Sequence, residues 1–405
     1  MTGDGVLSEH LAFALAAHRA LSPDTTRGGC LSPLSVASAL GLLAVGARAG
    51  TRDELLTALT GRPDGDLAAH TRLLGEASAL TDATALTAAT APTEGTAPTE
   101  GTAPAEGFAD DAPTLAVSNT LWVDDRVRIA PDFVHAMRRW PAGEVRSLPF
   151  RPDQEHARRV INEDVARATR GLIPDLLPPG AVRPDTLAAL VTALYLRAGW
   201  RHAFAERDTS PQPFHTPSGP HEVPTMRSTG RRGHAARDGW MLVRLPTDGG
   251  VDVDVLLPDD TAPGALAEAE ARLDTRRLRA LLAEVAPREV ELHLPVTRVG
   301  ATFRLDGALT ALGVRTAFGD AADLSGISVD PPLRVGTAVH EAVLRLDERG
   351  LEGAAATAVT FVPLMAVVER EEPLVVRVDR PFLLLVRHRA TGVVLFLARV
   401  TDPRG

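Results

Sequence analysis

The stretch DERGLEGAAATAVTFVPLMAVV, residues 347–368, decides how the rest of the chain is interpreted. It has no charged residue between Glu352 and Glu369, and after Gly353 no turn-forming residue occurs before Pro363. A solvated loop is normally more polar than this, and a buried strand carries bulkier side chains. The pattern therefore indicates a strand-like segment that lies outside its sheet.

Alternation along this segment separates two faces, because successive side chains of a strand point to opposite sides. One face carries the charge and consists of Glu352, Ala354, Ala356, Ala358 and Thr360. The other has no charge and consists of Leu351, Gly353, Ala355, Thr357, Val359 and Phe361. An alanine-rich helix is the alternative, because alanine is the best helix former. The flanking sequence has to decide between the two.

Composition limits the classes of protein to which the chain can belong. The 405 residues are 44% hydrophobic, which is enough for a substantial core. The length fits two or three domains, or one large α/β domain. The net charge of −9 argues against nucleic acid as a partner, and the arginine pairs are scattered. The chain has no lysine, which, with its many alanines and arginines, indicates a GC-rich genome.

Cys30 is the single cysteine, so neither an internal disulfide nor a CxxC metal site is expected. Its neighbours in GGCLSPLSV predict a small buried residue rather than a nucleophile. The N-terminus lacks the basic and apolar regions of a signal peptide, and no stretch is apolar for long enough to span a membrane. We expect a soluble cytoplasmic protein, unless it is exported by an unconventional route.

Helical patterns come first in the chain and strand patterns later, which predicts an α+β fold. SEHLAFALAAHRAL is typical of an amphipathic helix with Ser8 as its N-cap. Thr51 and Glu54 have the spacing of a capping box, in a helix predicted to end at Gly61. TLAALVTALYLRAGW, residues 186–200, fits either a helix or a buried strand.

Residues 82–113 differ in kind from the rest. They contain TAPTEG twice and TAPAEG once in succession, and proline, glycine and glutamate at this density cannot form a core. We expect a disordered low-complexity insertion at the surface.

Catalytic motifs are missing from the sequence. It has no GxSxG, no HExxH and no phosphate-binding glycine loop. His340-Glu341 lacks the second histidine of a zinc site. We therefore expect neither an enzyme nor a metal or other cofactor, although a Ser/His/Asp arrangement assembles in space and leaves little trace in sequence.

Five segments, in order, resemble those of the serpin family of serine protease inhibitors, in a bacterial-type form. They are SPLSVASALGLLAVGARAGTRDELL, INEDVARATRGLIPDLLPPG, LYLRAGWRHAF, DERGLEGAAATA and DRPFLLLVRHRATGVVLFLARVTDP. The resemblance implies a single serpin domain over residues 1–405, with helices packed on three β-sheets. It also implies an exposed reactive-centre loop over residues 348–372, which accounts for the strand-like segment outside its sheet.

The resemblance implies a function as a monomeric, irreversible suicide-substrate inhibitor. A target serine protease cleaves the loop and forms a covalent acyl-enzyme, after which the loop inserts into the main sheet and distorts the protease. Neither a membrane nor nucleic acid is an expected partner. A non-inhibitory serpin, acting as a binding module or chaperone, and an inhibitor of cysteine proteases are the alternatives.

The resemblance also assigns residues to three regions of the serpin machinery. The shutter, beneath the point where the sheet opens, matches Ser32, Ser35 and His340, with Thr192 in place of the family's asparagine. The breach, where insertion starts, matches Trp200. The hinge matches Glu348, Gly350, Leu351, Glu352, Gly353, Ala354, Ala355, Ala356 and Thr357. Leu351 and Gly353 depart from the family pattern, and both changes are expected to slow insertion.

Two counts place the scissile bond differently. The family's span from Glu348 ends at Leu364, with Met365 after the cut, whereas counting back from DRPF leads to Arg370 and Glu371. We favour the first count, because the inserted length determines how far the protease is carried. Leucine before the cut suits chymotrypsin-, elastase- or subtilisin-like proteases, whereas arginine suits trypsin-like proteases.

Overall fold

A computed structural model describes residues 3–78, 113–137, 143–151, 153–330, 332–352 and 372–405. No helix in these ranges is long and apolar enough to cross a membrane. The α-helices of the described ranges are α1 (Gly3–Leu21), α2 (Pro33–Gly46), α3 (Ala49–Thr60), α4 (Leu67–Ala77), α6 (Pro131–Met137), α7 (Gln154–Ala168), α8 (Ala265–Arg272), α9 (Thr275–Ala283) and α10 (Leu305–Ala311).

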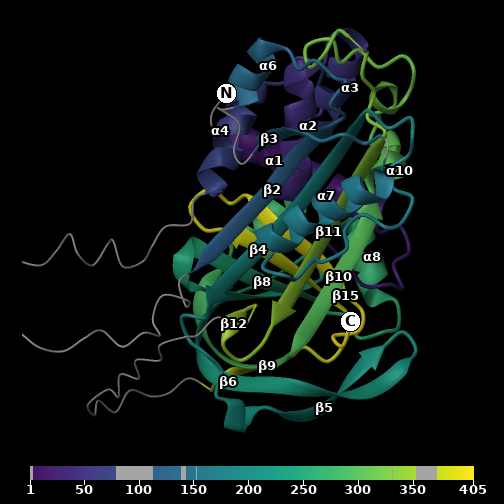
Figure 1. The fold of residues 1–405 in the computed structure, drawn as a ribbon. Coiled ribbons are helices and arrows are strands. Elements are labelled where there is room, and N and C mark those ends of the chain that lie inside the picture. Colours follow the sequence, from purple (N-terminus) through teal and green to yellow (C-terminus); the bar gives the residue numbers. More distant parts are fainter. Residues whose placement is uncertain (1–2, 79–112, 138–142, 152, 331, 353–371) are drawn as a thin grey trace, which may run out of the picture.

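A six-stranded sheet carries the segments singled out from the sequence (Figure 1). Its strands, in spatial order, are β10 (Thr297–Arg304), β11 (Thr337–Leu346), β12 (Gly350–Leu351), β4 (Ala188–Gly199), β2 (Thr114–Val123) and β3 (Gly143–Ser147). β11 and β4 run parallel and pair directly only at one end of the sheet, over residues 337–341 and 189–193. At the other end β12 lies between them.

The other strands form a nine-stranded sheet, whose two parts are connected by the long strand β6. Its strands are β1 (Gly29–Leu31), β15 (Val394–Val400), β14 (Phe382–His388), β8 (Val251–Pro258), β7 (Trp240–Pro246), β6 (Gly219–Arg237), β9 (Ala286–Pro295) and β13 (Leu374–Arg377), with β5 (Ser210–Thr216) also beside β6. The first part of β6 pairs with β5 and β9, and its last residues pair with β7. β6 therefore belongs to two sheets at once, and the predicted α+β fold of helices packed on three sheets is confirmed.

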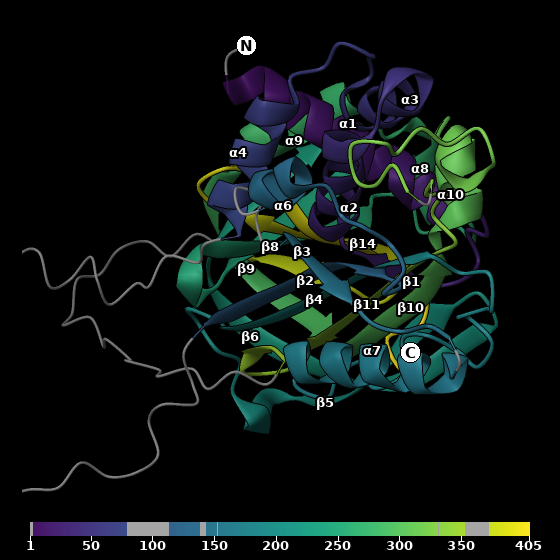
Figure 2. The ribbon, with the colours of Figure 1, turned by 45° about the horizontal axis from the view of Figure 1, so that its top comes forward.

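The six-stranded sheet has a buried layer on each face. α2 lies in the main core between the sheets and is buried along nearly its whole length. α7 crosses the other face (Figure 2) and packs Ala157, Ile161 and Val165 against a smaller cluster. Side chains of β4 alternate between these two layers, with Leu194 in the first and Ala193 in the second.

This double burial settles the segment that fitted a helix or a strand. Residues 188–199 form β4, and nearly all of them are buried. A strand covered on both faces has a continuous apolar run instead of alternation, so its periodicity cannot be told from that of a buried helix.

Two predicted helix starts are wrong, whereas the predicted end at Gly61 is confirmed by its left-handed φ of 79°. α1 begins at Gly3, so Ser8 lies inside the helix. α3 begins at Ala49, and its N-cap Arg48 makes no side-chain capping bond.

Thr51 and Glu54 bind a distant segment instead of capping α3. The Glu54 carboxylate accepts hydrogen bonds from the backbone N–H groups of Arg315 and Thr316, both at 2.8 Å. The Thr51 hydroxyl accepts one from the N–H of Asp323 at 3.0 Å. These bonds fix residues 315–323 to α3. Thr51 and Glu54 have the spacing of a capping box, but both side chains bind residues 315–323 instead of the N-terminus of α3.

Candidate functional site

A tight turn connects β11 to β12. The Asp347 carboxylate accepts hydrogen bonds from the N–H groups of Arg349 at 2.8 Å and Gly350 at 3.1 Å. Gly350 has a φ of 155°, and a Cβ atom there would lie 2.3 Å from the carbonyl oxygen of Ala198. Only glycine fits this position without displacing β4.

The turn brings Leu351 back into the sheet as part of β12. Leu351 pairs with Leu346 of β11 on one side and with Ala198 of β4 on the other. Its side chain is fully buried in the main core. The sheet is therefore already parted at the end that holds β12, while β11 and β4 stay paired at the opposite end (Figure 1).

Glu352 marks the point where the backbone leaves the extended conformation. Its φ is 55°, in the left-handed region that residues with side chains rarely adopt. Its N–H donates to the carbonyl of Arg345 at 3.0 Å, and its carboxylate forms an ion pair with the Arg345 guanidinium, also at 3.0 Å. Burial raises the pKa of Glu352, and the Arg345 charge opposes that shift.

Trp200, which matches the breach, donates two hydrogen bonds to the turn between β11 and β12. Its indole Nε1 donates to the carbonyl of Asp347 at 2.8 Å, and its backbone N–H donates to the carbonyl of Arg349 at 2.9 Å. The ring is buried and meets Phe204 edge-on, with centroids 6.4 Å apart. Trp200 thus contributes hydrogen bonds to the hinge as well as packing.

Glu348 is fixed by the same segment. Its carboxylate accepts a hydrogen bond from the Thr209 hydroxyl at 2.7 Å, and its carbonyl accepts the N–H of Phe204 at 3.0 Å. Trp200, Phe204 and Thr209 therefore hydrogen-bond to the hinge turn at residues 347–349.

The four residues assigned to the shutter lie together where β11 and β4 pair, with His340 and Thr192 in those two strands and Ser32 and Ser35 at the start of α2. His340 Nε2 accepts the backbone N–H of Ser32 at 2.9 Å, so Nδ1 carries the proton and donates to the Thr192 hydroxyl at 2.9 Å. Burial lowers the pKa of His340 to about 4, which keeps the ring neutral. Ser32 caps α2, and its hydroxyl lies 3.1 Å from both the N–H and the hydroxyl of Ser35.

Asn119 belongs to the same layer and was missed in the sequence. It lies in β2 directly opposite Thr192 and is 1% exposed. Neither atom of its amide has a hydrogen-bond partner among the described residues, and the same holds for the hydroxyl of Ser38. An asparagine on the apolar face of LAVSNTLWV was the available signal, because a buried amide in a strand needs partners.

Cys30 lies where the sequence placed it, in the core. It is fully buried, and burial raises the pKa of its thiol, which fits a structural residue. The remaining assigned residues fall outside the described ranges. These are Gly353, Ala354, Ala355, Ala356 and Thr357 of the hinge, Leu364, Met365, Arg370 and Glu371 of the two candidate bonds, and residues 82–112 of the insertion.

Comparison with known proteins agrees with this architecture. The family model for serpins (serine protease inhibitors) matches residues 8–403. Alpha-1-antiproteinase of Rattus norvegicus is 29% identical over 98% of this chain and 89% of its own length. Leukocyte elastase inhibitor of Sus scrofa is 28% identical over 96% of this chain and 97% of its own length. Human thyroxine-binding globulin, solved with thyroxine, superposes with a TM-score of 0.80 at 22% identity over the whole of both chains.

The chain belongs to the serpin family, because the family model covers almost all of it. Members of this family are mostly protease inhibitors and not enzymes, although the family also includes non-inhibitory proteins.

Proposed function

We propose that this serpin is an irreversible suicide-substrate inhibitor of a serine protease of the chymotrypsin, elastase or subtilisin type. The observation that carries the proposal is β12, where the start of the hinge already lies between β11 and β4. A sheet that is parted at one end and closed at the other has a defined path along which a cleaved loop can extend.

The register of β12 predicts where each loop residue would lie after insertion. Because β12 is antiparallel to both neighbours, each step along the loop moves one residue back on β11 and on β4. Thr357 is six residues beyond Leu351, so it would lie between His340 and Thr192. Insertion must therefore break the 2.9 Å bond between those two side chains and replace it with contacts to the loop.

The balance of interactions favours insertion once the loop is free. Opening the sheet costs one ladder, between residues 337–341 and 189–193, whereas the inserted strand forms a ladder on each side. Leu351 is buried before cleavage, so the apolar gain falls to Val359 and Phe361, at roughly 1.5–3 kcal/mol each. Insertion as far as Leu364 would carry a bound protease on the order of 40 Å.

The two departures from the family pattern act in different ways. Leucine at position 351 already has a fitted place in the main core, which supports its compatibility with insertion. Glycine at position 353 adds backbone entropy that insertion must overcome. A slower loop gives the protease time to hydrolyse the acyl-enzyme, so part of the inhibitor would be consumed as substrate.

The alternatives are a non-inhibitory binding module or chaperone, and an inhibitor of cysteine proteases. The likeness to thyroxine-binding globulin shows that the same fold occurs in a protein that binds thyroxine. Leu351, the first residue to insert, is buried and uncharged, which favours inhibition because a charged side chain there would oppose entry into the sheet.

The test is incubation with a panel of serine and cysteine proteases, followed by denaturing electrophoresis. An inhibitor forms a complex that survives SDS, and a protease lacking its nucleophile serves as the control that binds without trapping. The loop-cleaved protein should also melt at a markedly higher temperature than the intact protein, because the intact state lies above its free-energy minimum. Cleavage without a complex and without a gain in melting temperature would identify a non-inhibitory serpin.

A further inference from the structure

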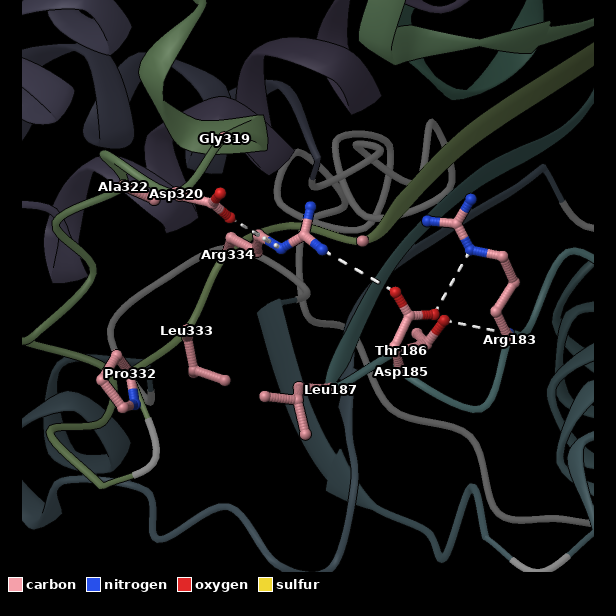
Figure 3. A pocket seen from close by; sticks show the side chains of 11 residues that line it. Arg183, Asp185, Thr186, Leu187, Gly319, Asp320, Ala322, Pro332, Leu333 and Arg334 are labelled. Carbon is pink, nitrogen blue, oxygen red and sulfur yellow. Dashed lines mark hydrogen bonds and ion pairs between the residues drawn. The ribbon is translucent and has the colours of Figure 1, made fainter.

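A cavity of about 180 Å³ lies at the end of the six-stranded sheet that is opposite β12. Figure 3 shows the side chains that line it. Two segments form most of its wall, one leading into β4 and the other into β11. Leu187 and Leu333 supply apolar surface, and Arg183 and Arg334 supply positive charge. Gly319, Asp320 and Ala322 complete the wall.

One side of the cavity belongs to the chain segment that α3 holds in place. Glu54 and Thr51 bind the backbone of residues 315, 316 and 323, which flank the cavity wall at residues 319–322. The N–H of Arg48 also donates to the carbonyl of Asp323 at 2.9 Å. These side chains, predicted from the sequence to cap a helix, instead fix one side of the cavity.

Arg334, one of the two cations of the cavity, has donors available for another acceptor. The Arg334 guanidinium lies between the carboxylates of Asp185 and Asp320, at 3.8 Å from each. Both distances exceed the 2.7–2.9 Å of a charge-assisted hydrogen bond. The Asp320 side chain is fully exposed, so the pair holds Arg334 only weakly.

The register of β12 leads to this cavity. Leu364 is 13 residues beyond Leu351, and counting back by the same number from Leu346 and Ala198 gives Leu333 and Asp185. Both of these residues line the cavity. The loop would follow β4 as far as its first residue, Ala188, and its last three residues would then enter the cavity.

We propose that this cavity binds the carboxyl end that cleavage creates at Leu364, with the carboxylate on Arg334 and the residues before it against Leu187 and Leu333. Hydrolysis of the Leu364–Met365 bond consumes one water and leaves a carboxylate on Leu364 and an ammonium group on Met365. The proposal rests on the proposed function, because it requires the loop to insert. It concerns the cleaved, protease-free form, since the same carbonyl is an ester in the covalent complex.

The place of the cavity also bears on the scissile bond. Cleavage at Arg370 would leave six more residues, roughly 20 Å of extended chain, beyond the cavity. Of the two candidate cuts, only the cut after Leu364 puts the new carboxylate at the level of the cavity.

The test uses the full-length protein, cleaved after Leu364 and treated with a serine carboxypeptidase that accepts proline before the terminal residue. Mass spectrometry follows the release of Leu364. A synthetic peptide with the sequence of residues 353–364 gives the rate for a free end. We expect slow release from the wild type, and release about fivefold faster from Arg334→Met, which keeps the stem but loses the charge.

Two further variants complete the design. Ala322→Trp fills the cavity and should also speed release, whereas Arg276→Met, an exposed arginine on α9, should leave the wild-type rate unchanged. Equal release from wild type, Arg334→Met and Ala322→Trp would overturn the cavity as the docking site. The melting temperature of the cleaved protein separates the two proposals: if it rises but the end is unprotected, insertion stands and only the cavity assignment fails. If it does not rise, the proposed function fails as well.

Discussion

Replacing Thr357 with arginine should convert the inhibitor into a substrate. In the register of β12, position 357 enters the sheet between His340 and Thr192, on the face that points to the main core. Ser32 and Ser35 lie there, and both are fully buried. An arginine at this position would bring a guanidinium into a layer with no carboxylate to pair with it among the described shutter residues.

The size of the effect follows from the desolvation of that charge. Burying an unpaired charge costs about 3–5 kcal/mol. If one third of that cost is added to the activation free energy of insertion as position 357 passes the shutter, insertion slows about tenfold, since 1.4 kcal/mol corresponds to a factor of ten. The protease then completes hydrolysis before it is carried away.

The assay measures the number of inhibitor molecules consumed for each protease molecule trapped, with the SDS-stable complex as the readout. Ala356→Arg is the matched control, because position 356 would face the opposite side, beside Glu341. Burial raises the pKa of Glu341, so its carboxylate would gain from a cation nearby. An unchanged stoichiometry for Thr357→Arg, or equal losses in both variants, would refute the register and the assignment of the two faces.

Three further outcomes are expected. Leu364→Arg should exchange trapping of chymotrypsin- or elastase-like proteases for trapping of trypsin, and mass spectrometry should show a released peptide beginning at residue 365; one beginning at Glu371 would support the other count. Gly350→Ala should lower the free energy of unfolding of the intact protein by about 2–3 kcal/mol, because the added Cβ would meet the Ala198 carbonyl. Calorimetry checks this, with Gly307→Ala as the control because the Cβ added there has open space. Stability should fall as pH decreases from 6.5 to 4, because an unfolded histidine binds a proton near 6.5 whereas His340 does so only near 4; this one group accounts for about 3 kcal/mol. Urea titrations of His340→Gln should show a shallower decline over that interval, and an equally steep one would exclude His340 as a cause.

The sequence was sufficient for the fold and for grouping the four residues assigned to the shutter. Ser32, Ser35, Thr192 and His340 come from three distant segments, and the family resemblance was enough to assign them to one cluster. The face of Leu351 followed from alternation once the family resemblance had favoured a strand, because the pleat of a strand sends every second side chain to the same side.

Several features depended on tertiary contacts and could not be deduced in advance. Thr51 and Glu54 have the spacing of a cap, but local spacing does not reveal that residues 315–323 compete for the same side chains. Asn119 carried only a weak signal, because its neighbour Thr192 is brought beside it by strand pairing and not by the chain.

The sequence by itself predicted that residues 347–361 are able to form a strand, since alternation and side-chain size are local properties, and the family resemblance favoured this strand over a helix. Only the tertiary structure decided that Leu351 already lies in the sheet, and in which register. Leu351 pairs there with Leu346 and Ala198. The hydrogen bonds of the turn at Asp347 and the bond from the Trp200 indole fix the position of this pairing. Strand pairing is a relation between distant segments, so its register is set by contacts that no single stretch of sequence contains.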